Sequence, residues 1–331
     1  MNNKQITWVL IILCLVSFFS CRKKLTKKSA DQYWEIGKDT YIYHFEQGIG
    51  EPVLVLHGGP AIPQSEAWTG LKPLTADFRF IYYHQRGCGK STRKFDKFDP
   101  DTPFYMNMIR LVEELGLGVH VRDIEKIRQI LEVDKISIIG HAFGSFLAAM
   151  YASEYPEYTK KLVLISPTDI FKHPSDNPGL FDLIKAKFHD PDLKNSYDLW
   201  YEKYFDYENY FIKDEKEVAS LHIEYSRFFQ KALAKMDRRI SVWEEDEIGG
   251  WVVPAIYLGL GKKYDLRELL EYIEAPALLI RGKHDLFPVE HCRDYLDNIN
   301  NIRLETINEG GHFVFALENE DFAMIIRDFL K

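Results

Sequence analysis

Two glycines flank an alanine at a position suited to presenting a nucleophile. The stretch Gly140-His-Ala-Phe-Gly144 directly follows the apolar run 136–139 and opens a helix-length apolar run over 143–155. This is the spacing of a nucleophile elbow, a tight strand-to-helix turn in which small residues at 140 and 144 avoid clashes. Such a turn holds side chain 142 above the edge of a sheet. The chemistry it favours is nucleophilic, and Ala142 occupies the nucleophile position.

Two further polar residues follow later apolar runs. Asp285 stands a few residues after the run 277–280, and His312 a few residues after the run 304–307. If these runs are parallel strands, their carboxyl ends and the elbow meet at one edge of the sheet. An aspartate there fixes the histidine tautomer and stabilises the imidazolium. The order elbow, Asp, His favours this interpretation over a loop-capping aspartate and a surface histidine.

A glycine-rich loop, His57-Gly-Gly-Pro60, follows the buried run 53–56. Glycines let the backbone approach a ligand closely, and backbone N–H groups can stabilise a negatively charged oxygen. We expect the N–H groups of Gly59 and Phe143 to form an oxyanion hole, with His57 and Gly58 contacting the substrate. The alternative is a Gly-Pro turn without chemical meaning.

The elements that must position these residues alternate along the chain. Expected strands cover 41–45, 53–56, 79–83, 136–139, 162–165, 277–280 and 304–307. Expected helices cover 119–131, 143–155, 289–296 and 315–330. The alternation predicts an α/β fold with a parallel, doubly wound sheet.

Residues 167–274 interrupt this alternation. Aromatic residues recur there at intervals of three and four, which is typical of one apolar helical face: Tyr197, Trp200, Tyr201, Tyr204 and Phe205. We expect a mostly helical cap whose aromatic face packs in the protein core rather than around a cofactor. The α/β core would then comprise residues 33–166 and 275–331.

Together these motifs resemble the proline iminopeptidases, serine aminopeptidases of the α/β-hydrolase fold, over about residues 33–331. The resemblance rests on residues 57–61 and 84–91, the elbow, Asp285 and His312. It implies a mostly parallel eight-stranded sheet, helices on both faces and a helical cap after the sixth strand. It also implies that Glu244, beside Trp243, binds the free amino terminus of a peptide. A solvated acidic helix face explains the acidic run 244–247 equally well.

The sequence departs from that family at three positions. Ala61 and His84 replace a glycine and an aspartate, and Ala142 replaces the nucleophilic serine. A methyl group cannot attack a carbonyl, so the family mechanism cannot form an acyl-enzyme here. Loss of such a serine lowers turnover roughly a millionfold. Ser145 lies about one helical turn below the elbow, so we expect it to point away from His312.

The first 32 residues have the features of an export signal and a tether. After Lys4, residues 6–20 form one uncharged, mostly apolar run, shorter than the roughly 20 residues of a membrane-spanning helix. The sequence Ser-Phe-Phe-Ser-Cys21 resembles a bacterial lipoprotein signal, which implies Cys21 as a lipid anchor in the membrane. The alternative is ordinary cleavage nearby. We expect a signal peptide over 1–20, a basic tether over 21–32 and an exported protein of the cell envelope, either membrane-anchored or periplasmic or secreted. This intact leader favours a natural loss of the serine over a deliberate Ser→Ala change.

The composition limits the classes of function. The 331 residues are 46% hydrophobic and 28% charged, as in a folded globular protein. The net charge is -8, and six basic residues and no acid precede residue 31, so removing those six charges leaves -14 on the rest. This acidity argues against a nucleic-acid partner. The absence of a His-Glu-x-x-His pair, and His84 where a phosphate-binding loop needs glycine, predict no metal and no nucleotide cofactor. Pairing of Cys88 with Cys292 stays open.

Three functions remain open on the sequence. The first is a hydrolase of the iminopeptidase type that cuts N-terminal, proline-like residues from short peptides and is inactive or strongly impaired with Ala142. The second is a non-catalytic protein that binds a peptide or a small acyl or amide ligand in the same pocket. In the third, His312 and Asp285 act as a general base without a covalent intermediate.

Overall fold

The computed structural model describes residues 27–28, 32–235, 237 and 247–331. The leader, Cys21 and most of the expected tether therefore lie outside the described residues. Within the described ranges, no helix is both long enough and apolar enough to cross a membrane.

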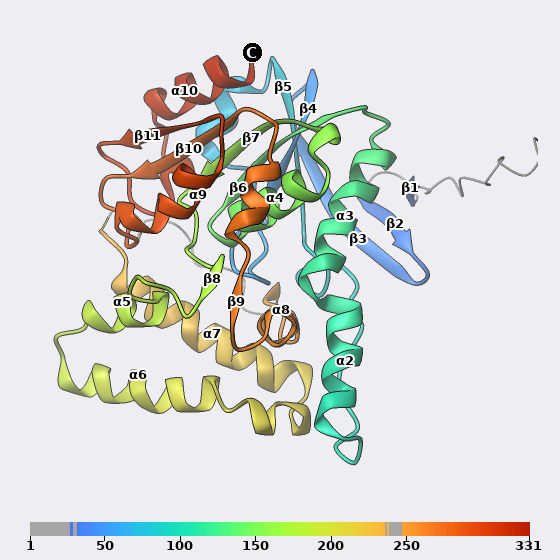
Figure 1. Cartoon of the computed structure of the whole chain (residues 1–331), viewed down its shortest axis with the longest axis vertical. Helices are drawn as coiled ribbons and strands as arrows, with labels where there is room; N and C mark the ends of the chain where they lie inside the picture. The colour runs from blue at the N-terminus through green and yellow to red at the C-terminus, as the bar shows by residue number, and fades with distance from the viewer. Residues whose placement is uncertain (1–26, 29–31, 236, 238–246) are drawn as a thin grey trace, which may run out of the picture.

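A mostly parallel sheet forms the centre of the fold (Figure 1). Its order is β1-β2-β3-β5-β4-β6-β7-β10-β11, and all neighbours from β5 onward are parallel. Apart from the two-residue β1, the sheet has the eight strands expected. The inner strands β6 and β10 are buried along their whole length, which explains their continuous apolar sequence. The bounds are β1 Lys27–Lys28, β2 Tyr33–Gly37, β3 Thr40–Gln47, β4 Glu51–Leu56, β5 Phe78–Tyr83, β6 Ile136–His141, β7 Thr159–Ile165, β10 Ala277–Gly282 and β11 Ile302–Ile307.

Helices of the core pack in two groups. In one group α3 lies on α4, and α4 lies against β6 and β7. The short helix η6 (Arg267–Tyr272), at the end of the segment expected as the cap, packs on α4 and α9 and so joins this group. In the other, α10 packs on η1 (Thr69–Leu74). The helix bounds are α2 Phe104–Leu115, α3 Leu117–Ile130, α4 Phe143–Glu154, α9 Arg293–Asn298 and α10 Glu320–Leu330.

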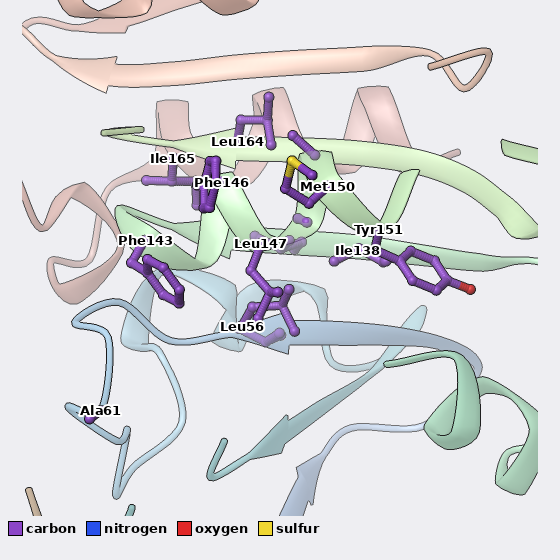
Figure 2. Packing of buried hydrophobic residues seen from close by; sticks show 14 of the residues in the cluster. Leu56, Ala61, Ile138, Phe143, Phe146, Leu147, Met150, Tyr151, Leu164 and Ile165 are labelled. Atoms are coloured by element: carbon purple, nitrogen blue, oxygen red, sulfur yellow. The ribbon is translucent and has the colours of Figure 1, made fainter. Parts of the chain in front are cut away.

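Helix α4 is buried on nearly all sides, as the helix that follows an elbow must be. Ten of its residues are buried, from Phe143 to Ala152. Figure 2 shows Phe146 and Leu147 among the strands, with Leu56 and Ile165 close by. A helix that is hydrophobic all round fits this central position.

The cap lies between β7 and β10, as expected, and contains four α-helices among the described residues (Figure 1). Polar caps fix the starts of α6 and α7: Asp190 accepts N–H bonds before α6, and Asp214 forms a capping box with Glu217. Tyr197, Trp200 and Tyr204 are buried, whereas Tyr201 is 39% exposed. The cap elements are β8 Lys172–His173, α5 Leu180–Ala186, α6 Pro191–Tyr204, η3 Tyr207–Ile212, α7 Glu215–Ala232, α8 Val252–Leu260 and β9 Tyr264–Asp265.

Two expected helices are interrupted. The segment expected over 289–296 is a 3-10 turn, η7 Val289–Cys292, followed by α9. The segment expected over 315–330 contains the turn η8 Val314–Ala316, and α10 begins only at Glu320 because the Asn319 side chain accepts the N–H of Phe322. Helix α2 was not expected from the sequence.

Candidate active site

The elbow has the strained geometry that its glycines predict. Ala142 lies between β6 and α4 with φ 49° and ψ -116°, a conformation that costs free energy for any residue with a Cβ. A Cβ on Gly140 would lie 2.3 Å from the carbonyl oxygen of Gly144, and one on Gly144 would lie 2.4 Å from that of Leu56. The Ala142 N–H donates to the carbonyl oxygen of Ile165 at 2.9 Å. Backbone contacts therefore hold residue 142 at the edge of the sheet.

Asp285 and His312 form a buried pair beside the elbow. Nδ1 of His312 lies 2.9 Å from Oδ1 of Asp285, and the two side chains are only 3% and 1% exposed. Burial disfavours the Asp285 carboxylate, but the His312 imidazole and the N–H of Phe287 outweigh burial, and the pKa of Asp285 is lowered. The carboxylate thus holds His312 with Nδ1 as the donor. This leaves Nε2 of the neutral ring as a base.

One pocket brings the expected residues together. It encloses about 510 Å³ of empty space, counting its mouth, and Ala142, His312, Gly58 and Gly59 all line it. Asp285 lies behind His312 and does not line it. Apart from the histidines, the described lining residues are uncharged, and most are apolar or aromatic: Ile62, Gln64, Thr168, Leu180, Tyr225, Phe229, Phe287 and Phe313. Such a lining suits a small ligand with one apolar group.

The glycine loop approaches the elbow closely enough to share a ligand with it. A Cβ on Gly58 would lie 3.3 Å from the Cβ of Ala142, and Gly59 adopts a φ of 116° that favours glycine. The N–H groups of Gly59 and Phe143 have no hydrogen-bond partner among the described residues. Gly59 also lines the pocket, whereas Phe143 does not.

The placement of His57 differs from the expected substrate contact. Its Nδ1 donates to the carbonyl oxygen of Gly58 at 2.8 Å, and its Nε2 accepts the N–H of Gln85 at 3.0 Å. Complete burial lowers the pKa of His57 to about 3, so the ring is neutral. His57 does not line the pocket. It joins the glycine loop to the segment after β5, because both of its nitrogens are used by the backbone.

That segment after β5 is a structural support. Arg86 donates two hydrogen bonds to Asp123 on α3, at 2.8 and 2.6 Å, and both side chains are buried. His84 accepts the N–H of Lys90, and burial lowers the pKa of His84 to about 4. Cys88 is a buried free thiol, and so is Cys292, so the two form no disulfide.

Two neighbours of the elbow support it through hydrogen bonds, and one of them, His141, was not recognised from the sequence. Nε2 of His141 lies 3.1 Å from the carbonyl oxygen of His312, and a carbonyl only accepts, so His141 is the donor. The Ser145 hydroxyl, which has one proton to donate, lies 2.8 Å from the carbonyl oxygen of Gly140 and 3.1 Å from that of Ile165, and it accepts the N–H of Ile165. Ser145 therefore points away from His312, as expected. Adjacency to the elbow is the one sequence signal that could have found His141.

The expected amino-terminus binding segment cannot be placed. Trp243 and Glu244 lie outside the described residues. Among the residues that the structure describes, no group of three or more His, Cys, Asp or Glu side chains could hold a metal ion.

Fold and site together define the class of protein. The chain matches the family described as alpha/beta hydrolase fold over residues 51–318, and it belongs to that family. Within it, the chain is similar to proline iminopeptidases: 28% identical over 301 residues to that of Heyndrickxia coagulans, covering 86% of this chain and 92% of the relative. It is 25% identical over 283 residues to that of Neisseria gonorrhoeae, covering 77% of this chain and 81% of the relative.

Solved structures agree on the fold. The proline iminopeptidase of Mycobacterium smegmatis superposes with a TM-score of 0.57 at 17% identity, covering 91% of this chain and 97% of that one. VinJ superposes with a TM-score of 0.61 at 19% identity, covering 91% and 98%. At these identities the likeness concerns the fold alone.

Proposed function

We propose that this chain is a proline-iminopeptidase-type hydrolase site without its nucleophile, which binds the amino-terminal end of short peptides and does not cleave them by the covalent route. The observation that carries the proposal is the combination of a strained elbow at Ala142 and an intact Asp285–His312 pair in one pocket. The similarity to proline iminopeptidases over most of the chain supports a peptide or amide ligand.

The chemistry follows from the position of each group. With serine at 142, Nε2 of His312 takes the hydroxyl proton as the oxygen attacks the substrate carbonyl. Asp285 stabilises the imidazolium, and the N–H groups of Gly59 and Phe143 stabilise the oxyanion. His312 then gives the proton to the leaving amine as the C–N bond breaks, and a water molecule activated by the same imidazole hydrolyses the acyl-enzyme and restores the serine. With alanine, the carbonyl is still bound and polarised, but no acyl-enzyme forms.

Restoring the hydroxyl tests this proposal. We expect Ala142→Ser to hydrolyse proline 4-nitroanilide or another aminoacyl amide, with turnover roughly a millionfold above the alanine form. The double variant Ala142→Ser with His312→Ala is the control and should lose this gain. An Ala142→Ser protein that is folded but silent on aminoacyl amides, peptides and esters would refute the proposal. The alanine form should bind prolinamide or a proline peptide without turnover, which a thermal shift measures.

A second candidate is general-base catalysis without a covalent intermediate. It is favoured by Nε2 of His312, which has no hydrogen-bond partner among the described residues and belongs to a ring that lines the pocket. Such a base could activate water beside the methyl group of Ala142. Turnover by the unsubstituted chain that is lost in His312→Ala would establish this candidate. Equal turnover in both proteins would exclude it.

We further propose that the protein is exported and anchored through a lipid on Cys21. The apolar run, the Ser-Phe-Phe-Ser-Cys21 sequence and the basic residues that follow support this location. Membrane fractionation after expression in a bacterium tests it. Cys21→Ser should release the protein from the membrane fraction, and unchanged partition would contradict lipid anchoring.

A further inference from the structure

The buried carboxylate of Asp237, in the cap, accepts hydrogen bonds from the backbone of the histidine loop, which we define as residues 308–313 between β11 and η8. Asp237 follows α7 by five residues and is only 2% exposed. Its Oδ2 accepts the N–H of His312 at 3.0 Å, and its Oδ1 accepts the N–H of Phe313 at 3.1 Å. One side chain of the cap therefore holds the amides of two consecutive residues that line the pocket, 75 and 76 residues away in sequence.

The histidine loop is shaped to receive this carboxylate. A Cβ on Gly311 would overlap the carboxylate group of Asp237, so only glycine leaves room there. Hydrogen bonds from N–H groups to a carboxylate are stronger than those to a neutral acceptor. The contact is therefore specific and not incidental packing. We call these two hydrogen bonds, from the N–H groups of His312 and Phe313 to the Asp237 carboxylate, the clamp.

His312 is fixed from three directions. Asp237 holds its N–H, His141 holds its carbonyl oxygen, and Asp285 holds its ring. The last two belong to the core, and the first belongs to the cap. Phe229 of α7 adds a second cap contact, with its ring centroid 5.6 Å from that of His312.

We propose that Asp237 is a positioning residue that couples the cap to His312, so that the imidazole is aligned over residue 142 only while this part of the cap is seated on the core. The placement rests on the geometry alone, and the role of His312 as a base rests on the proposed function. A ligand that binds under the cap would thereby stabilise the aligned form of the histidine loop.

Amide hydrogen exchange in the chain with Ala142 tests the clamp with no need for catalytic activity. We expect Asp237→Asn to accelerate exchange of the His312 and Phe313 amides about tenfold or more, the loss expected for charge-assisted hydrogen bonds. Amides of β10 and β11 serve as the internal reference and should keep their rates. Glu224→Gln, on the exposed face of α7, is the matched control and should change neither set.

Gly311→Ala is a second variant that expels the carboxylate while leaving Asp237 in place, and it should reproduce the local acceleration. Rates at 312 and 313 within about twofold of the unsubstituted chain in both variants would overturn the proposal, because opening of this loop would then be independent of the clamp. Equal acceleration of these amides and of β10 and β11 in both variants would also overturn it, because Asp237 would then be a general stabilising residue.

Kinetics separate this proposal from the proposed function. In the Ala142→Ser form, Asp237→Asn should lower kcat about tenfold and leave KM within about twofold, because the change misaligns the base without removing a ligand contact. An unchanged kcat would overturn the coupling. If Ala142→Ser is silent on every substrate and the exchange result is as expected, the proposed function fails and the clamp stands.

Discussion

Buried histidines should make the stability of this protein fall as the pH falls, and His222 in the cap allows a clean test. Its Nε2 donates to the carbonyl oxygen of Gly250 at 2.9 Å, so its Nδ1 accepts the hydroxyl of Tyr204 at 3.1 Å. Burial lowers the pKa of His222 to about 4. The neutral ring thus joins α7, α6 and the segment before α8.

The sign and size of the effect follow from the two pKa values. Unfolded histidine binds a proton below its usual pKa of about 6.5, whereas folded His222 does so only below about 4. Between these values the unfolded state holds more protons, so stability falls as the pH falls, and it falls no further below about pH 4. At pH 5 the free energy of unfolding is lower than at neutral pH by about 2 kcal/mol because of this one group.

The assay compares His222→Gln with the unsubstituted chain by urea unfolding at pH 7.5, 6 and 5. Glutamine can donate to Gly250 and accept from Tyr204, but it does not titrate. Between pH 7.5 and 5 the free energy of unfolding of the variant should therefore fall by about 2 kcal/mol less than that of the unsubstituted chain. His189→Gln, at an exposed histidine, is the control.

Carboxyl groups with raised pKa values do not disturb this comparison. Burial raises the pKa of Asp294 to about 6 and also raises those of Glu215 and Asp237. These groups bind protons first in the folded state, so they stabilise it as the pH falls. They are common to all the proteins compared. Equal pH dependence in His222→Gln and in the unsubstituted chain would refute the reasoning.

Three further predictions concern the supports of the site. Ala142→Gly should stabilise the fold by about 1 kcal/mol in chemical denaturation, because glycine adopts a φ of 49° with less strain; a clear loss of stability would contradict this. Asp123→Asn should lower the free energy of unfolding by about 3 to 5 kcal/mol, because the Arg86 charge is left buried and unpaired; a melting temperature near that of the unsubstituted chain would exclude it. Ser145→Ala should cost about 1 to 3 kcal/mol, because the buried N–H of Ile165 loses its acceptor, and a neutral result would show that water replaces the hydroxyl.

The sheet and the placement of Ala142, Asp285 and His312 could be predicted because they depend on local pattern. Buried parallel strands need continuous apolar runs, and parallel strands deliver their carboxyl ends to one edge. The glycines at 140 and 144 add a local requirement, since a Cβ at either position would meet backbone. Each of these signals lies within a few residues of the feature it predicts.

The remaining features depend on contacts between distant segments. His57 follows a buried strand just as a ligand-binding residue would, but its partner Gln85 turns it into the core. Asp237 has no local signal, because its donors are 75 and 76 residues away. The start of α10, by contrast, was placed five residues too early although its signal is local, because the Asn319 side chain accepts the N–H of Phe322 and caps the helix there.

The groups that position the site do not depend on the side chain at 142. The elbow is fixed by the backbone of Ala142 and by Ser145, and His312 is fixed by Asp285, His141 and Asp237. A hydroxyl added at 142 would enter the pocket that this residue already lines and would break none of these bonds. The strained turn costs free energy, and so does burial of the polar Asp285–His312 pair. These positioning contacts are compatible with serine at 142, so we expect Ala142→Ser to add the nucleophilic oxygen without rearrangement of its surroundings.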